Sequence, residues 1–175
     1  MSKKMLAALV CAALLLLTLT ATAEVITLPE KTSRFDITLE LPEGAKLISS
    51  QLNGEYTQAE ISKGELAGVM IGIAPSDETE QRSMADLSQE EMEGLKQLAG
   101  EQYENPLFNV ETTPDGNLYL HLCSNEANDI DSIFTLYKGY FVELTQHYDD
   151  FRSLTEEDNS FLLDLLHGIE FVEAK

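Results

Sequence analysis

Hydrophobic and polar residues alternate along residues 34–41, the clearest strand pattern in the chain. Successive side chains of a strand point to opposite faces, so the four apolar side chains would share one face and the polar ones the other. The apolar residues are Phe35, Ile37, Leu39 and Leu41. The pattern predicts a strand with one face in water, and Pro-Glu-Gly at 42–44 predicts the turn that ends it.

Two further extended segments flank Asn53-Gly54, the residue pair preferred in a hairpin turn of type I′. We therefore expect residues 45–52 and 55–62 to form a β-hairpin. Residues 66–74 read as another strand, in which two glycines indicate close packing or bending.

A helix is expected to begin at Ser88. Ser88 and Glu91 have the spacing of a capping box, and Leu87 and Met92 that of a hydrophobic staple. Four apolar residues at helical spacing would form the buried face. They are Met92, Leu95, Leu98 and Ala99. Asn-Pro at 105–106 would end the segment.

The second half of the chain predicts an antiparallel meander of four strands. They span residues 107–112, 117–123, 132–137 and 140–148, and Pro114-Asp115-Gly116 predicts the turn between the first two. Lys138-Gly139 is a two-residue hairpin turn, so Tyr137 would pair with Tyr140 and Ile133 with Leu144. By the same register Phe134 would face Glu143.

Both faces of this meander are expected to be apolar. One face would collect Leu118, Leu120, Leu122, Ile133, Val142 and Leu144. The other would collect Tyr119, Cys123, Phe134, Leu136 and Phe141. Such a sheet must be covered on both sides, by helices on each face or by a helix on one face and a strand layer on the other.

The last helix is expected to begin at Thr155, whose spacing to Asp158 resembles a capping box. Its buried stripe is predicted to consist of Phe161, Leu162, Leu165 and Leu166. Gly168 stands where a helix-ending glycine belongs, with Ile169 packing back as in a Schellman motif. Phe171-Val172 would then form a short edge strand.

Three segments in this order resemble the PsbP-like family, which also includes the Mog-type Ran-binding proteins. They are FDITLELPEGAKL (35–47), YKGYFVELT (137–145) and NSFLLDLLHGIEF (159–171). The resemblance implies an α/β fold of the α+β kind, an α/β/α sandwich with a mainly antiparallel sheet. It also implies a protein that binds or assists other proteins. The family shares no catalytic motif, so no functional residue is carried over.

Residues 1–23 have the layout of a secretory signal peptide. Two lysines precede an apolar run from Met5 to Leu17, and Ala21-Thr22-Ala23 offers a cleavage site. The run is shorter than the roughly 20 residues that span a bilayer. We expect cleavage before Glu24 and a product that is secreted or held in the periplasm or cell envelope. Residues 24–33 would be an N-terminal extension, and 34–175 a single domain.

The chain is strongly acidic, with a formal net charge of −20. Such a charge repels phosphate backbones and anionic lipid surfaces, which excludes nucleic acids and anionic membranes as expected partners. Cys123 is the single cysteine beyond the predicted signal peptide, so no disulfide can form within the mature chain. Stability would have to come from packing.

No hydrolase, zinc-peptidase, phosphate-loop or dinucleotide motif occurs, so no catalytic residue and no cofactor are expected. The best metal candidate is the acidic loop at 125–131, with Glu126, Asp129 and Asp131. Calcium takes hard oxygen ligands, although the spacing is not that of an EF-hand. Two interpretations stay open: a solvated connecting loop, or a calcium-dependent or hydrolytic site.

Aromatic residues near the last hairpin are the second candidate. Tyr137, Tyr140 and Tyr148 could anchor a partner at a sheet edge or could be core residues with a wet hydroxyl. Together these patterns favour an exported, non-catalytic binding or accessory protein whose partner is another extracytoplasmic protein. An extracytoplasmic hydrolase or calcium-dependent protein is the alternative.

Overall fold

The computed structural model describes residues 23–30, 34–63, 66–76, 81–101, 106–123, 130–147 and 155–174. Within these ranges the chain has ten strands, two α-helices and one short 3-10 helix, and every strand pairing is antiparallel. The protein is therefore of the α+β class, as expected. Neither of the described helices is long and apolar enough to cross a membrane.

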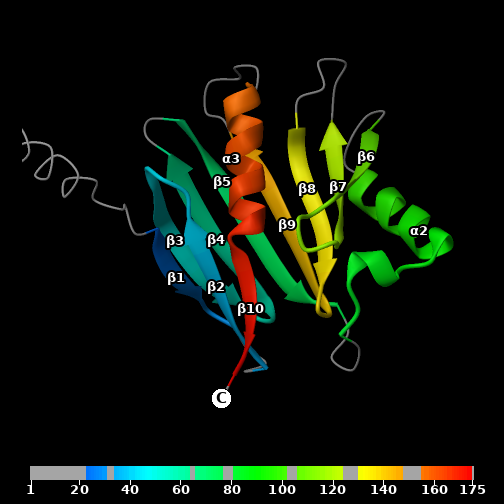
Figure 1. Ribbon diagram of the computed structural model, residues 1–175, viewed down its shortest axis with the longest axis horizontal. Coiled ribbons are helices and arrows are strands. Elements are labelled where there is room, and N and C mark those ends of the chain that lie inside the picture. The colour runs from blue at the N-terminus through cyan, green and yellow to red at the C-terminus, as the bar shows by residue number, and fades with distance from the viewer. Residues whose placement is uncertain are drawn as a thin grey trace, which may run out of the picture.

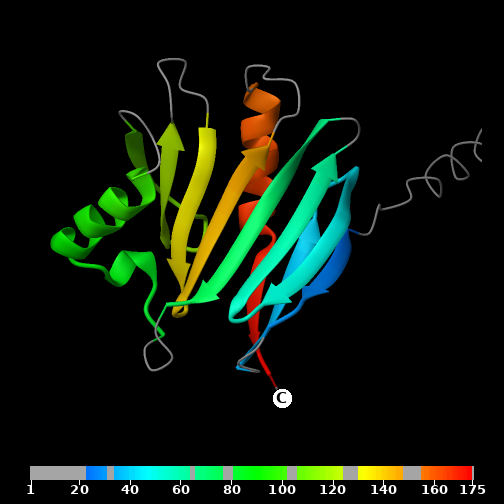
Figure 2. The same cartoon turned by 180° about the vertical axis from the view of Figure 1, so that it is seen from behind.

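The larger sheet has seven strands in the order β3-β4-β5-β9-β8-β7-β6 (Figures 1 and 2). Its strands are β3 (Ala45–Asn53), β4 (Tyr56–Lys63), β5 (Leu66–Pro75), β6 (Leu107–Thr112), β7 (Leu118–Cys123), β8 (Ile130–Tyr137) and β9 (Tyr140–His147). Neighbours in this sheet follow one another along the chain, except where β5 pairs with β9 and so joins the first hairpin to the later meander.

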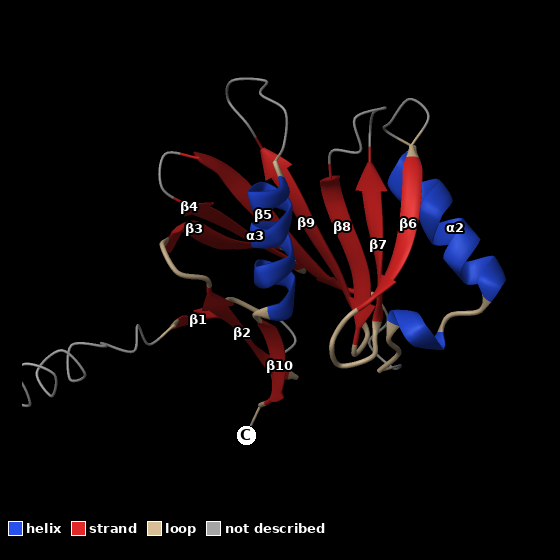
Figure 3. Cartoon of the chain, turned by 45° about the horizontal axis from the view of Figure 1, so that its top comes forward, coloured by secondary structure: helices blue, strands red, loops and turns tan. Residues whose placement is uncertain are grey.

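A smaller sheet packs against one end of the larger one, and Figure 3 shows it as a separate layer. It consists of β1 (Glu24–Leu28), β2 (Phe35–Leu41) and β10 (Ile169–Glu173), with β2 in the middle. The predicted alternation of β2 is confirmed. We expected residues 24–33 to precede the domain, but β1 belongs to it: its five residues pair with β2, and Leu28 is buried.

The two hairpin turns differ from each other. Lys138 and Gly139 both have positive φ, as a type I′ turn requires, and the predicted register of β8 with β9 is confirmed. In the first hairpin Asn53 pairs with Tyr56, so the turn residues are Gly54-Glu55 and not Asn53-Gly54. Gly54 alone has positive φ there, the pattern of a type II′ turn.

Helix α2 (Gln89–Gly100) begins as predicted, with Ser88 and Glu91 exchanging capping hydrogen bonds. Arg82 binds both Glu91 oxygens, at 2.8 and 2.9 Å. These hydrogen bonds, first from Arg82 and then from Ser88, lower the pKa of Glu91 to about 2. The predicted buried face is wrong at Leu98, which is 68% exposed, because the helix turns Ala99 and Gly100 to the sheet instead.

Two hydrophobic cores lie on opposite faces of the larger sheet. One fills the space between this sheet, the small sheet and α3 (Glu156–His167), whose predicted stripe is buried. The other lies beneath α2 and the 3-10 helix η1 (Met84–Asp86), a segment expected to be loop, in which Met84 is fully buried. The sheet is thus covered by a helix on one face and by a helix with a strand layer on the other.

The face assignment of β7 was wrong. Leu120 pairs with Phe134, so Leu120 and Leu122 lie in the core beneath α2, whereas Tyr119 lies with Ile133 in the core beneath α3. The grouping within β8 and β9 was correct. Shifting a strand by one residue moves its whole set of side chains to the other face, and β7 is one residue out of the expected phase.

The N-terminus of α3 provides a test of its predicted cap. The Thr155 hydroxyl accepts from Asp158 N, and Thr155 N donates to the Asp158 carboxylate at 2.8 Å. Thr155→Ala is expected to lower the free energy of unfolding by about 1 kcal/mol, because orphan amides of the first turn lose their partner. Ser160→Ala, at an exposed position of the same helix, should leave the free energy of unfolding unchanged or raise it slightly. Urea unfolding of both variants would measure this, and equal effects would argue against the cap.

Candidate functional site

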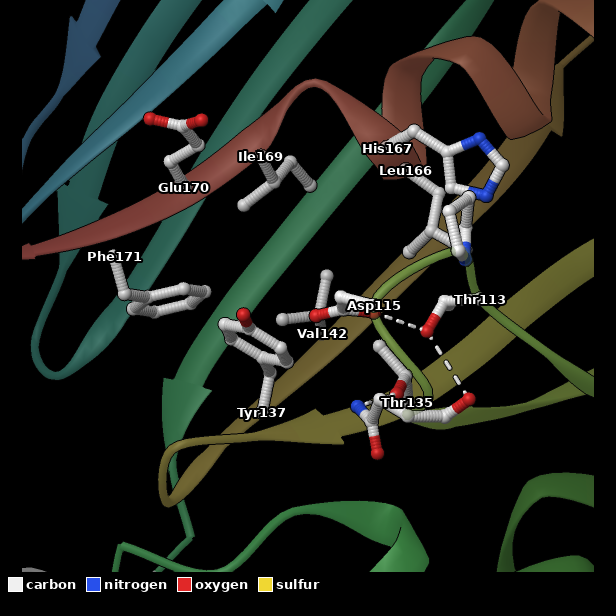
Figure 4. Close-up of a pocket in the computed structure, with 12 residues that line it drawn as sticks. Thr113, Asp115, Thr135, Tyr137, Val142, Leu166, His167, Ile169, Glu170 and Phe171 are labelled. Carbon is white, nitrogen blue, oxygen red and sulfur yellow. Dashed lines mark hydrogen bonds between the residues drawn. The ribbon is translucent and has the colours of Figure 1, made fainter.

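A pocket of about 280 Å³ opens on the α3 side of the larger sheet. Three segments far apart in the sequence form it: the turn between β6 and β7, the hairpin strands β8 and β9, and the junction of α3 with β10. Its lining residues are Thr113, Pro114, Asp115, Asn117, Thr135, Tyr137, Val142, Leu166, His167, Ile169, Glu170 and Phe171. Figure 4 shows the rings of Tyr137 and Phe171 on one side and Leu166 with His167 on the other.

Most of the pocket wall is apolar. The rings of Tyr137 and Phe171 lie 5.5 Å apart at 40°, and Phe171 also packs on Tyr140 at 5.0 Å. Val142 and Leu166 are buried at its base. Phe171 and Leu166 belong to the main core. The pocket is therefore a depression at the edge of that core, and the packing of the core fixes its shape.

The polar wall is the turn at 113–117, which the Pro-Asp-Gly pattern predicted. Gly116 has a φ of 89°, and its amide donates to the Thr113 carbonyl at 2.9 Å. The Thr113 hydroxyl donates to the Asp115 carboxylate, and Tyr137 contributes a further hydrogen bond. These bonds lower the pKa of Asp115, the Thr113 bond most strongly, so Asp115 is anionic at neutral pH.

The deeper polar groups are bonded within the protein. Asn117 donates to the Thr135 hydroxyl at 3.2 Å and to the Leu136 carbonyl at 3.0 Å, and accepts from Ala85 N at 3.2 Å. The Thr135 hydroxyl donates to the Leu118 carbonyl at 2.7 Å. Asn117 therefore ties the turn to β8 and to η1, and these groups hold the pocket in shape.

The structure places two of the three candidate tyrosines, and they lie in different surroundings. Tyr137 is half-buried and lines the pocket, with its pKa raised by burial and by the nearby Asp115 and Glu170 carboxylates. Tyr140 is 2% exposed in the core, and its hydroxyl donates to Glu30 at 2.9 Å. Tyr148 lies outside the described residues. Of the two described tyrosines, Tyr137 is the one that lines the pocket.

Of the acidic loop at 125–131, the structure describes only the last two residues, 130 and 131. Glu126 and Asp129 lie outside the described residues, and of Asp131 only the backbone is described, within β8. Among the side chains that the structure describes, no group of three His, Cys, Asp or Glu residues is arranged to hold a metal ion. The calcium prediction for residues 125–131 remains a prediction.

Tyr119, Glu111 and His121 form a second polar group, on β6 and β7. The Tyr119 hydroxyl donates to Glu111 Oε2 at 2.8 Å, and His121 Nδ1 lies 3.5 Å from Glu111 Oε1. Tyr119 is 4% exposed, and burial together with the Glu111 carboxylate raises its pKa strongly. The neutral phenol is therefore the form that the fold stabilises.

This raised pKa predicts a loss of stability in alkali. The folded phenol has a higher pKa than the unfolded one, whose ordinary value is 10.0, so its contribution is intact below pH 10 and falls as the pH rises further. We expect the free energy of unfolding to fall less steeply above pH 10 in Tyr119→Phe than in the natural chain. Urea unfolding across a pH series would measure the slopes, and identical slopes would contradict the assignment.

Sequence reasoning found Tyr137 but missed the rest of the pocket. The turn at 113–117 was identified only as a turn, and residues 166–171 only as the end of a helix and a strand. No family model, curated protein or solved structure matches the chain.

Proposed function

We propose that this protein is an exported, non-catalytic binding or accessory protein that docks another extracytoplasmic protein, with the pocket beside Tyr137 as its docking point. The observation that carries this proposal is the chemistry of the pocket. Its wall is mostly apolar, and its polar lining residues Asn117 and Thr135 already bond to each other or to the backbone. An apolar pocket with a few fixed polar groups is the usual form of a binding site.

Export is supported by the position of β1. This strand begins at Glu24, directly after the expected cleavage site, so removing residues 1–23 would leave every described strand intact. N-terminal sequencing of the mature protein from the producing cell tests this part. A start at Glu24 is expected, and retention of residues 1–23 would contradict it.

The PsbP-like sandwich is the finer fold that we propose. Its three characteristic segments correspond to β2 with its turn, to the β8–β9 hairpin, and to α3 with β10. In addition, helices cover the larger sheet on both faces. An experimental structure superposed on a member of that family would test the proposal, and a different strand order would contradict it.

Docking can be tested by incorporating a photocrosslinking amino acid at single positions of this protein and expressing each variant in the producing cell. At His167, which is exposed and lines the pocket, it should capture one defined envelope protein. At Glu90, exposed on α2, it should not capture that protein. Filling the pocket with Ile169→Trp should abolish the product from position 167. A product that survives this change, or that also forms from position 90, would contradict docking at the pocket.

A further inference from the structure

We propose that the pocket beside Tyr137 receives an arginine side chain of the partner protein. This inference rests on the proposed docking function and adds the chemistry of the group that is recognised. It stands on three observations: negative charge at the pocket from separate sources, an aromatic face that already attracts a cation, and a size that fits a single side chain.

Two carboxylates line the pocket, Asp115 from the β6–β7 turn and Glu170 from β10. Both carboxylates contribute, after burial, to the raised pKa of Tyr137, and Figure 4 shows Glu170 at the edge of the pocket with its carboxylate directed away from the Tyr137 ring. Asp115 is held in its charged form by the Thr113 hydroxyl, and Glu170 is exposed. A cation at the mouth would thus meet two negative groups from independent segments.

The end of α3 adds to this potential. Leu166 and His167, the last two residues of the helix, line the pocket. The carboxyl end of a helix carries a partial negative charge and favours cations within its last turn. Two side chains and one helix end therefore favour the same sign of ligand, in a chain whose net charge of −20 favours it as well.

The aromatic wall already attracts a cation from within the chain. Lys138 Nζ lies 5.6 Å from the ring centre of Tyr137 and 5.7 Å from that of Phe35, and it donates to the Phe171 carbonyl at 2.9 Å. This lysine shows that the aromatic cluster provides a cation–π surface, although its own positive charge offsets part of the negative charge at that wall. Among biological cations, a guanidinium stacks best on such rings and also forms paired hydrogen bonds with carboxylates.

The volume of the pocket further restricts the size of ligand that it can bind. Pockets for drug-sized ligands usually measure about 300–1,000 Å³, so a pocket of about 280 Å³ is at the small end. One long side chain with an apolar stem and a charged head would fill its apolar base and reach its acidic edge. Arginine combines such a stem with a planar head, which identifies it as the expected occupant.

The test compares two small probes that differ in charge. N-acetyl-arginine amide and its neutral isostere N-acetyl-citrulline amide are titrated into the isotopically labelled mature protein, and backbone amide shifts are followed by NMR. The arginine probe should shift the amides of Asp115, Tyr137 and Glu170 and bind roughly tenfold more tightly than the citrulline probe. Its affinity should fall with added salt, since exposed charges are screened.

A matched pair of variants assigns the effect to the pocket. Glu170→Gln should weaken the arginine probe by about two- to fivefold. Glu173→Gln, the same change on the same strand but outside the pocket, should leave it unchanged. Both residues are exposed, so a thermal melt is expected to confirm the fold in each case.

Three results would overturn the inference. They are equal binding of arginine and citrulline probes, equal effects of the two variants, and tighter binding of free spermidine than of the arginine probe, which would assign the pocket to small amines. None of these would affect the crosslink from position 167, which tests docking itself. Conversely, loss of that crosslink with arginine selectivity intact would contradict the docking function alone.

Discussion

Gly168→Ala is expected to lower the free energy of unfolding by about 3 kcal/mol. Gly168 follows α3 with φ −78° and ψ −9°, a conformation that any residue adopts, so the Schellman ending predicted from sequence is wrong. The glycine is required by a close approach: a Cβ there would lie 2.4 Å from the Glu40 carbonyl oxygen of β2. Strand β2 cannot move away from position 168 without breaking a hydrogen bond, because Glu40 N donates to the Gly168 carbonyl at 2.9 Å.

Gly94→Ala is the matched control, because a Cβ at this exposed position of α2 would meet nothing within 4 Å. Alanine is favoured over glycine inside a helix by up to about 1 kcal/mol, so this variant should be more stable than the natural chain. Urea unfolding would compare the two. A tolerated alanine at position 168 would show that β2 does not approach the end of α3 this closely.

Leu162→Ala is expected to have an effect of similar size, lowering the free energy of unfolding by about 2–5 kcal/mol. Leu162 is fully buried on α3, within the core that joins both sheets. Removing its branched end leaves a cavity that neighbouring side chains from separate elements cannot fill by a small shift. Because that core contains both sheets, the whole domain should lose stability in one transition.

Leu98→Ala provides the matched control for this second variant. Leu98 was predicted to be buried, yet it is 68% exposed on α2, so its truncation should change the free energy of unfolding by no more than about 0.5 kcal/mol. Urea midpoints of the two variants give the comparison. A large loss at Leu98 would mean that α2 turns its predicted face to the sheet after all.

The elements predicted best from sequence are those set by local chemistry. The β8–β9 register follows from a two-residue turn, which leaves no freedom once Lys138 and Gly139 adopt positive φ. Both helix starts follow from capping residues three positions apart. In each case the information lies within a few residues.

The wrong predictions concern features that are determined by contacts between segments distant in sequence. The phase of β7 is set by its pairing with β8, which includes a bulge between Leu122 and Cys123, and the sequence between the two strands has no two-residue turn pattern that would fix their register. Gly168 is explained by Glu40, which is remote in sequence. The pocket is formed by three segments that meet only in the folded chain, so no local sequence pattern could predict it.

The small sheet has a consequence for how the chain folds. Its middle strand β2 lies between the first described strand, β1, and the last, β10. Pairing of β10 with β2 closes a loop that contains nearly the whole domain, and such distant contacts form slowly. The main core therefore cannot close until residues 169–173 are available to pair, and until that late step β2 keeps one unpaired edge.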